Sequence, residues 1–342
     1  MPTRVLSNAD VSVAVEAPAR LHMGFFDLNG SLGRKYGSLG LTLDGLSTHV
    51  SVSRGLGASL SGAESERARR YLNRLREVID LPEDISVSVH TAIPSHAGLG
   101  SGTQLALALG TAASRLAGSD LSPREIAHLL DRGARSGIGV AAFEQGGFVI
   151  DGGRGANDAP PPLIARLAFP PAWRILLLLD QAAAGLHGQA EASAFAELPP
   201  FPEVESQRLC RELLIRGLPA LAEADLAAFG KVITDLQNTI GDYFAPAQGG
   251  RYTSPRVAAA LAALSAGGAQ CIGQSSWGPT GFAILASDSD ARLWKERLAP
   301  KFSSLDLMIC SARNRGGETT AVTESGSPRA ERSMLGRSGR ND

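Results

Sequence analysis

The stretch PSHAGLGSGTQLALALGTAA, residues Pro94–Ala113, places three glycines, two serines, a threonine and a histidine directly before a run of helix-forming residues. The residues ahead of it, Ile85–His90, alternate apolar and polar side chains, which predicts a half-buried strand. The local unit is therefore a strand, a glycine loop and a helix. The first N–H groups of such a helix have no partner within it and lie at the positive end of its dipole, so an anion can bind there.

The composition of the glycine loop favours a phosphate as that anion. Gly98, Gly100 and Gly102 can adopt positive φ and leave no Cβ between backbone and ligand. Side-chain donors follow at Ser101, Thr103 and Gln104. The alternative is an ordinary glycine turn with Ser101 or Thr103 as the N-cap. No Lys-Ser or Lys-Thr pair follows the last glycine and the spacing is not GxGxxG, so this is neither a P-loop nor a dinucleotide fingerprint.

Length, charge and cysteine content limit the classes of function. A chain of 342 residues predicts two domains or one bipartite fold. The net charge of -1 and the dispersed basic residues argue against a nucleic acid or an anionic membrane as partner. The cysteines, Cys210, Cys271 and Cys310, lack CxxC spacing, so we expect neither disulfides nor a thiolate zinc site. No stretch resembles a signal peptide or a transmembrane helix, and we expect a soluble, cytoplasmic protein.

The periodicity of the first half predicts strands joined by glycine-containing turns up to Ser53, followed by helices. A polar helix from about Ser65 to Ile79 has an apolar face of Tyr71, Leu72, Leu75, Val78 and Ile79. The sequence Ser122-Pro-Arg-Glu125 predicts a capped helix over Pro123–Gly133. A cluster of Gly, Asn and Pro at Asp151–Pro162 marks the exit from this domain, which we place at residues 1–165.

The second half, residues 166–324, is predicted to be an α+β domain of split βαβ type. The expected elements are a strand at Trp173–Asp180, helices at Val204–Arg216, Leu226–Ile240 and Ser254–Ala266, a strand at Phe282–Ala286, a helix from Asp288 capped by Ser287, and a strand at Leu305–Ser311. Gln237, Asn238 and Asp242 then fall at or just beyond the end of the Leu226–Ile240 helix. Residues 325–342 are rich in Gly, Ser, Pro and Arg, which predicts a disordered tail.

Three further polar, glycine-bearing segments are Arg20–Gly24, Arg135–Gly147 and Gly273–Gly281. Three of the polar segments resemble the three motifs of the GHMP kinase superfamily: APARLHMG, PSHAGLGSG and GQSSWGPTG. They occur in the same order and extend over nearly the whole chain before the tail. The resemblance implies an α+β, two-domain GHMP kinase-like fold, with a first domain like domain 2 of ribosomal protein S5 and a ferredoxin-like second domain. It also implies that the second motif holds phosphates, that the third closes on them, and that the first helps to form the substrate site.

One departure from the kinases of this superfamily concerns the catalytic base. Many of them have Ser-Gly-x-Asp, in which the aspartate takes the proton of the accepting hydroxyl. This sequence has Ser136-Gly-Ile-Gly139 instead. A glycine cannot accept a proton, so the usual kinase base is missing.

Four longer segments, SHAGLGSGTQLALA, RSGIGVAAFEQGGFVIDGG, QNTIGDYFAPAQGG and GQSSWGPTGFAI, resemble one non-kinase branch, the family of β-ribofuranosylaminobenzene 5′-phosphate synthases. This resemblance implies a decarboxylating phosphoribosyltransferase of tetrahydromethanopterin biosynthesis. Such an enzyme joins phosphoribosyl pyrophosphate to 4-aminobenzoate, or to a 4-hydroxybenzoate-like acceptor, and releases CO2 and pyrophosphate. The resemblance further implies Mg²⁺ but no organic cofactor, small-molecule substrates and a homodimer. A loop that holds the phosphates of ATP can also hold the diphosphate of this donor.

The candidate site residues follow from these motifs. The catalytic candidates are Arg20, His22, Gln274 and Ser275. The diphosphate cradle is expected at Pro94, His96, Gly98, Leu99, Gly100, Ser101, Gly102, Thr103 and Gln104. Candidates for substrate binding are Arg20, His22, Asp27, Arg135, Glu144, Gln237, Asn238, Asp242, Ser276 and Trp277, and those for the metal are Ser101 and Glu144. Arg20 and His22 would hold the 5′-phosphate or the benzoate carboxylate, and Trp277 would close over the donor or stack on the acceptor.

Each of these assignments has a structural alternative. Arg20 and the acids Asp27, Glu144 and Asp242 could form ordinary ion pairs. Gln237 and Asn238 could cap a helix. His96 could be exposed to solvent, and Trp277 could belong to the core. The function also has two alternatives. One is an ATP-dependent small-molecule kinase of the same fold. The other is a non-catalytic sensor of a phosphosugar or nucleotide that kept the loop after losing the base.

Overall fold

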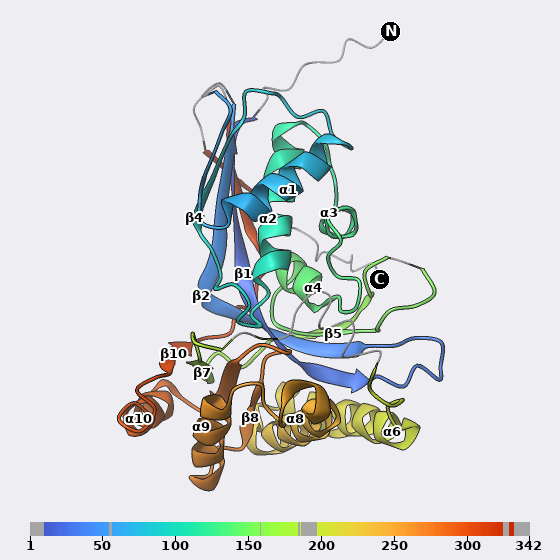
Figure 1. The fold of residues 1–342 in the computed structure, drawn as a ribbon, viewed down its shortest axis with the longest axis vertical. Helices are drawn as coiled ribbons and strands as arrows, with labels where there is room; N and C mark the ends of the chain where they lie inside the picture. The colour runs from blue at the N-terminus through green and yellow to red at the C-terminus, as the bar shows by residue number, and fades with distance from the viewer. Residues whose placement is uncertain are drawn as a thin grey trace, which may run out of the picture.

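The computed structural model describes residues 10–54, 57–157, 159–183, 185, 197–323 and 328–331. Two β-sheets organise these residues, and the helices of the first half cover one face of the first sheet (Figure 1). The predicted α+β class is confirmed. In this part of the chain, no helix has the length and apolar character to cross a bilayer.

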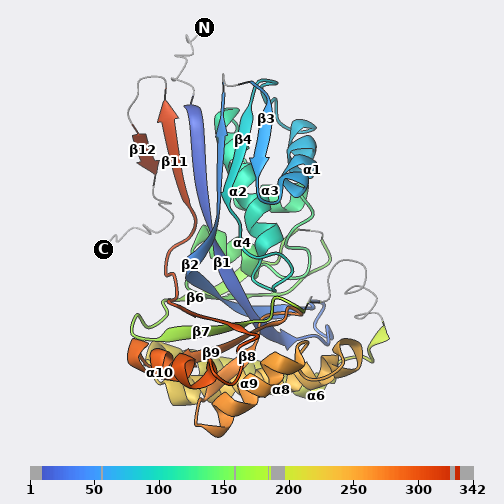
Figure 2. The same cartoon turned by 60° about the vertical axis from the view of Figure 1, so that its left-hand side comes forward.

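The first sheet holds the N-terminal half of the chain and two strands from its far end. Its strands lie in the order β12-β11-β1-β2-β4-β3, and β5 pairs with β2 and with β6. All pairs are antiparallel except β3 with β4. The bounds are β1 (Asp10–Asp27), β2 (Gly37–Ser53), β3 (Ser59–Gly62), β4 (Ser86–Thr91), β5 (Phe148–Asp151), β6 (Leu163–Leu167), β11 (Glu318–Thr323) and β12 (Pro328–Glu331). Figure 2 shows β11 beside β1, so the end of the chain returns to the first domain.

Helices provide the apolar faces that cover the sheets. Their bounds are α1 (Ser65–Arg76), α2 (Ser101–Leu116), α3 (Pro123–Leu129), α4 (Ile138–Glu144), α6 (Glu203–Glu212), a π-helical turn (Leu213–Gly217), α7 (Leu218–Ala222), α8 (Leu226–Gln248), α9 (Pro255–Ala266) and α10 (Asp288–Leu298). Val13, Val50 and Val87 of the first sheet share a core with the buried faces of α1 and α2. Burial of these apolar faces holds α2, the helix that follows the glycine loop, against the sheet.

The second sheet is antiparallel, with its strands in the order β10-β7-β9-β8. The bounds are β7 (Arg174–Leu179), β8 (Cys271–Gln274), β9 (Thr280–Leu285) and β10 (Asp306–Cys310). The succession of strand, helices, two strands, helix and strand has the split βαβ form that the sequence predicts, but β8 was not among the predicted strands. Leu176 and Leu178 pack with α9 and α10, whereas Ile175 and Leu177 on the other face join a core that includes β1 and α8. One continuous core therefore connects the two domains.

Strand β1 is irregular where the first polar segment lies. Its pairing with β2 shifts register three times between Pro18 and Asp27. Such bulges increase the twist of a strand and redirect its side chains. Residues 20–24 thus meet the second domain, where a Cβ on Gly24 would lie only 2.5 Å from Cδ2 of Leu236 in α8.

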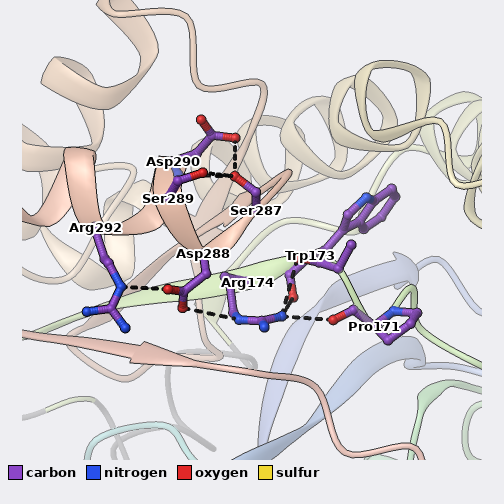
Figure 3. Close-up of polar contacts among 9 residues, drawn as sticks. Pro171, Trp173, Arg174, Ser287, Asp288, Ser289, Asp290 and Arg292 are labelled. Carbon is purple, nitrogen blue, oxygen red and sulfur yellow. Dashed lines mark hydrogen bonds and ion pairs between the residues drawn. The ribbon is translucent and has the colours of Figure 1, made fainter.

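The predicted helix caps are confirmed. Ser122 forms a capping box with Glu125 at the start of α3, and Ser287 accepts the N–H of Asp290 at the start of α10. Figure 3 shows the second of these caps beside Asp288, which lies between Arg174 and Arg292. This ion-pair group ties the beginning of β7 to the beginning of α10.

Several details of the predicted helices are wrong. The helix predicted over Pro123–Gly133 ends at Leu129, and the one predicted over Val204–Arg216 changes to a π-helical turn at Leu213. The helix expected to end at Ile240 continues to Gln248, because its apolar stripe extends through Phe244 and the stop is Gly249, with φ 81°. Gln237, Asn238 and Asp242 therefore lie within α8 and not at its end. Val78, expected on a buried face, is 56% exposed, because α1 ends at Arg76.

The domain limits of 1–165 and 166–324 stay a prediction. The chain passes from one sheet to the other between Leu167, which ends β6, and Arg174, which begins β7, while β11 belongs to the first sheet. Most of the predicted tail, residues 325–342, lies outside the described residues. Residues 328–331 are described, and they form strand β12, paired with β11, rather than coil.

Candidate active site

The glycine loop joins β4 to α2 and ends at Gly100, the N-cap of α2, which is left-handed with φ 90°. Gly98 is left-handed too, with φ 80°. A Cβ on Gly98 would lie 2.2 Å from the carbonyl oxygen of Ser275, whereas one on Gly102 would meet no neighbouring heavy atom closer than 3.5 Å. Gly98 is therefore required for contact with the third motif, a reason that the sequence did not suggest.

The three motifs meet at the hydroxyl of Ser275. This hydroxyl donates to the carbonyl of Gly98 at 2.8 Å and accepts the backbone N–H of His22 at 3.0 Å. The Arg20 guanidinium donates to the same Gly98 carbonyl at 2.6 Å, and the N–H of Ser276 donates to the carbonyl of His22 at 3.0 Å. Ser275 is fully buried and its hydroxyl is used in both directions. Its side chain thus holds the motifs together and does not face a ligand, contrary to its expected catalytic role.

A cavity of about 390 Å³ opens over the glycine loop. Four arginines from separate segments line it: Arg20 of β1, Arg67 and Arg70 of α1, and Arg132 beyond α3. Among the described residues that line this cavity there is no aspartate or glutamate. We call it the arginine cavity. Guanidinium groups bind phosphate oxygens in forked pairs of hydrogen bonds, so the arginine cavity suits a polyanion with more than one phosphate.

Arg132 is held in place above the start of α2. Its guanidinium carbon lies 5.4 Å from the centre of the Tyr71 ring, a cation–π arrangement. The hydroxyl of Tyr71 donates to the carbonyl of Gly102 at 3.3 Å, and burial raises the pKa of this tyrosine. Nε of Arg132 is buried and has no hydrogen-bond partner among the described residues. Because Arg132 lines the arginine cavity, its guanidinium is placed to bind an anion there.

A second pocket adjoins the arginine cavity and shares Ser276 and Trp277 with it. Aromatic rings form much of its wall. The rings of Phe244 and Trp277 are 4.3 Å apart, and those of His22 and Phe25 are 4.7 Å apart. The free space in this aromatic pocket is about 30 Å³, which is room for one or two water molecules.

His22 is the titratable residue that the first motif contributes to the wall of the aromatic pocket. It is only 4% exposed, and its Nδ1 has no hydrogen-bond partner in the described part of the chain. Burial lowers the pKa of His22 to about 3, and the charge of Arg20 adds to this shift. The imidazole is therefore neutral at physiological pH, so it could offer the expected phosphate or carboxylate a hydrogen bond but no charge.

Comparison with known proteins agrees with this geometry. Two family models match the chain, that of the GHMP kinases N terminal domain over residues 66–147 and that of the GHMP kinases C terminal over residues 218–303. The β-ribofuranosylphenol 5′-phosphate synthase of Archaeoglobus fulgidus is 34% identical over 318 residues, which cover 89% of this chain and 98% of the relative. The corresponding synthase of Methanothermobacter thermautotrophicus is 30% identical over 328 residues, which cover 90% and 98%. The chain belongs to this synthase family.

Solved structures show the same fold at lower identity. A mevalonate diphosphate decarboxylase from Enterococcus faecalis has a TM-score of 0.63 at 19% identity, with 91% of this chain and 99% of that chain covered. A homoserine kinase from Cytophaga hutchinsonii has a TM-score of 0.58 at 19% identity, with 93% and 99% covered. The predicted GHMP kinase fold and the predicted family are both confirmed. The relatives of the synthase family are named for a phenol, where the sequence resemblance had suggested an aminobenzene.

The position where the kinases have their base, Gly139 in this chain, lies at a contact between two helices. A Cβ on Gly139 would lie 2.9 Å from Cγ2 of Thr103, so α4 touches the start of α2 there. The side chain of Gln104 donates to the carbonyl of Gly139 at 2.8 Å and is fully buried. Gln104 therefore supports this contact and does not reach the arginine cavity, whereas Thr103 lines that cavity.

The three predicted acids do not gather at the arginine cavity. Asp27 accepts a backbone N–H within its own turn. Glu144 pairs with Arg124 at 3.6 Å, and burial raises its pKa. Asp242 accepts two hydrogen bonds from Arg251, at 2.7 and 2.9 Å. Ordinary ion pairs, the structural alternative, therefore account for Glu144 and Asp242.

The expected metal pair is also separated. Ser101 lines the arginine cavity, but Glu144 does not. Across the ranges that the structure describes, no group of three or more histidines, cysteines, aspartates or glutamates could hold a metal ion.

The predicted amides line the aromatic pocket or its rim, with their polar groups largely engaged. Gln237 donates to the carbonyl of Met23 at 2.7 Å and accepts the N–H of Gln274 at 2.8 Å. Gln274 in turn donates to the carbonyl of Ser276 at 2.9 Å. Asn238 accepts from Arg251 at 3.0 Å. These side chains shape the pocket and leave little hydrogen-bonding capacity for a ligand.

The remaining predicted residues fall into three groups. Gly98, Gly100, Ser101, Gly102, Thr103, His96, Ser276 and Trp277 line the arginine cavity as expected. Leu99 is fully buried in the core, and Pro94 is exposed beside the loop. Arg135 is half-buried and belongs to neither the arginine cavity nor the aromatic pocket.

The sequence interpretation missed Arg67, Arg70 and Arg132, which supply most of the positive charge of the cavity. Arg67 and Arg70 are three residues apart on the predicted polar helix, so they lie on neighbouring turns of one face. Their spacing is a signal that could have been used, whereas nothing near Arg132 in the sequence indicates that it returns to the glycine loop.

Proposed function

We propose that this chain transfers a phosphoribosyl group from phosphoribosyl pyrophosphate to a para-substituted benzoate, with release of pyrophosphate and CO2. The observation that carries the proposal is the arginine cavity, which is lined by four guanidinium groups and, among the described residues, by no carboxylate, although Arg67 also pairs with Glu64 at 3.2 Å. The donor has a diphosphate at one end of its ribose and a phosphate at the other. A site that binds both groups therefore needs several positively charged side chains. The relatives' names describe a ribofuranosyl phosphate attached to a phenol, which is the product expected from 4-hydroxybenzoate.

The proposed reaction requires stabilisation of a leaving anion more than it requires a base. The bond between ribose C1 and the diphosphate oxygen breaks, and its electron pair stays with pyrophosphate. The ring carbon that carries the carboxylate bonds to C1. The bond from that carbon to the carboxylate then breaks, CO2 leaves, and the electrons restore the aromatic ring. Arg20, Arg132 and the N–H groups of the loop would stabilise the departing diphosphate.

Magnesium stays a prediction for this site. The described residues that line the arginine cavity offer the hydroxyl of Ser101 but no carboxylate. A protein-held Mg²⁺ ordinarily has at least one carboxylate ligand, so these residues do not fit a resident ion. No step of the proposed reaction is assigned to one, and any Mg²⁺ would arrive bound to the donor's diphosphate.

The two alternatives have less support. A kinase would need a base near the accepting hydroxyl, and the expected position of that base, Gly139, is packed against Thr103. A sensor would bind phosphoribosyl pyrophosphate without turning it over. A place in tetrahydromethanopterin biosynthesis and a homodimer accord with the family and are part of this proposal.

The test uses carboxyl-labelled 4-hydroxybenzoate and carboxyl-labelled 4-aminobenzoate, each with phosphoribosyl pyrophosphate. We expect release of labelled CO2 together with pyrophosphate, and the ratio of the two rates identifies the preferred acceptor. Arg132→Met should reduce both rates, while Arg76→Met, an exposed arginine of α1 outside the arginine cavity, is the matched control. Donor binding without CO2 from either acceptor would favour the sensor, and ATP consumption with an alcohol would favour the kinase.

A further inference from the structure

The aromatic pocket lies where an acceptor for the arginine cavity would have to be. Arg20 and His22 are two residues apart in a stretch of β1 that pairs with β2 in unbroken register, so both side chains lie on one side of the strand. Arg20 lines the arginine cavity, His22 lines the aromatic pocket, and Ser276 and Trp277 line both. A ring in the pocket would thus have one edge next to the donor.

The wall of the pocket suits an aromatic ring. Phe25, Phe244 and Trp277 present ring surfaces to it. The one cationic side chain on the wall, among the described residues, is Arg251, whose guanidinium already makes two hydrogen bonds to Asp242. The pocket is therefore lined by aromatic rings together with neutral polar groups and is nearly neutral in charge, in contrast to the arginine cavity beside it.

His22 is a buried polar side chain of this wall with hydrogen-bonding capacity to spare. Its side chain is more than nine-tenths buried, and its Nδ1 has no hydrogen-bond partner on another residue in the described ranges; a contact with its own backbone is the one interaction that raises its pKa. Since the imidazole is uncharged, one ring nitrogen carries a lone pair that can accept a hydrogen bond. A buried nitrogen without a partner costs free energy, so a ligand that donates a hydrogen to it gains by binding.

We propose that the aromatic pocket binds the ring of the acceptor and that His22 accepts the hydrogen of its para hydroxyl or amino group. This inference rests on the proposed function. The acceptor's carboxylate-bearing carbon must reach ribose C1, so its para substituent is at the opposite end of the ring, inside the pocket. His22 is then a catalytic residue, because it touches the group whose electrons drive the attack.

The steps balance in atoms, protons and electrons. As the ring carbon bonds to C1 and pyrophosphate leaves, electrons of the para oxygen move into the ring and the O–H proton passes to His22. When the bond to the carboxylate breaks, CO2 leaves and the ring becomes aromatic again. The proton then returns from His22 to the oxygen, which gives the phenol.

A weak base is sufficient for this transfer. A phenol holds its proton firmly in the ground state, so neutral His22 accepts only a hydrogen bond from it. Once the ring has attacked C1, the para O–H belongs to a cationic, oxygen-stabilised system and becomes strongly acidic. A buried imidazole can take the proton at that stage and return it afterwards, which confines its help to the transition state.

Binding of a ring requires the pocket to widen, because its present space of about 30 Å³ is less than a benzene ring occupies. The side chain best placed to yield is Arg251, which is 43% exposed and follows Gly249 and Gly250 in the connection between α8 and α9. Movement of Arg251 with its partner Asp242 would open the rim without disturbing His22.

The test compares 4-hydroxybenzoate with 4-methoxybenzoate in the full chain. The two para groups donate electrons similarly, but the methoxy group has no hydrogen to give. The wild type should turn over the hydroxy acceptor at least about 100-fold faster, the usual contribution of general-base catalysis. In His22→Phe, kcat for the hydroxy acceptor should fall by about that factor, while kcat for the methoxy acceptor changes little.

His22→Gln keeps a hydrogen-bond acceptor and should restore part of the preference. His90→Gln, an exposed histidine of β4 outside both sites, is the matched control. Pyrophosphate binding, measured by calorimetry, should be unchanged in His22→Phe. That result verifies that the variant is folded. If the wild type is active and His22→Phe keeps the wild-type preference for the hydroxy acceptor, the role of His22 is refuted and the proposed function stands. A wild type that releases no CO2 from either 4-hydroxybenzoate or 4-aminobenzoate overturns both.

Discussion

Replacement of Gly98 by alanine is expected to separate the glycine loop from the third motif. The added Cβ would lie 2.2 Å from the carbonyl oxygen of Ser275 and 2.9 Å from Cα of Gly278. Real Cβ contacts are essentially never shorter than 3.0 Å, so the two loops must move apart by about 0.8 Å. Both neighbours are backbone atoms, and no side-chain rotation can relieve the overlap.

The cost can be estimated from the contacts at Gly98. An alanine with φ near 80° costs about 1 to 2 kcal/mol. Separation of the loops weakens the hydrogen bonds that the Gly98 carbonyl accepts from Ser275 and Arg20, each of which contributes about 1 kcal/mol. The free energy of unfolding should therefore fall by about 3 to 4 kcal/mol. Arg20 also loses its anchor, so affinity for the donor should fall at least about tenfold.

The matched control is Gly102→Ala in the same loop and helix start. Gly102 is helical and does not have positive φ, and its added Cβ would approach no neighbour closer than 3.5 Å. Its free energy of unfolding should change by less than about 1 kcal/mol. Urea unfolding followed by tryptophan fluorescence and calorimetry with phosphoribosyl pyrophosphate measure the two effects. Equal unfolding free energies for the two variants would refute the proposed contact between the motifs.

Three other changes address the charge, the missing base and the buried histidine. Arg132→Met should raise the donor's dissociation constant about 10- to 100-fold in calorimetry, because a charge-assisted hydrogen bond is lost, while Arg76→Met should not. Gly139→Asp should destabilise the fold by about 1 to 3 kcal/mol through its overlap with Thr103 and should produce no ATP turnover; a stable variant with kinase activity would contradict this. His22 has a pKa of about 3 in the folded chain against 6.5 unfolded, so its contribution to stability is complete above pH 6.5 and is lost as the pH falls toward 3. Between pH 6.5 and pH 5 the wild type should lose about 2 kcal/mol more than His22→Phe in urea titrations, and equal losses would show that the imidazole is not buried and neutral.

The glycine loop and the split βαβ domain could be predicted because their signals are local. Pro94–Ala113 contains its own strand exit, turn residues and helix formers, and no distant residue is needed to place them. The caps at Ser122 and Ser287 are local in the same sense, because the capping side chain and the N–H it accepts are three residues apart. The end of α8 was misplaced because Phe244 continues the apolar stripe one turn beyond Ile240, and the stop signal, Gly249, comes later.

The chemistry of the site was harder to predict because it depends on which side chains converge. Arg67, Arg70 and Arg132 meet only after α1 and α3 pack around α2. Burial decides the roles of others, since Gln104 and Ser275 are polar residues in polar motifs but have no exposed surface. Sequence patterns identify residue types and spacings, whereas burial is a property of the packed chain.

The arginine cavity is positively charged and the aromatic pocket is nearly neutral. This difference explains why the chain has the glycine loop of the kinases but lacks their catalytic aspartate. In a kinase the phosphate moves to the acceptor, so a base must deprotonate that acceptor next to the phosphate. In the proposed transfer the diphosphate leaves, and the ribose carbon left behind becomes cationic. Arginines stabilise the anion but would oppose a cation at close range. Phe244 and Trp277 form part of the wall of the adjoining aromatic pocket, where aromatic faces favour positive charge and Arg251 is balanced by Asp242. Loss of an aspartate at Gly139 is tolerable under this arrangement, because the attacking atom is a ring carbon without a proton to remove.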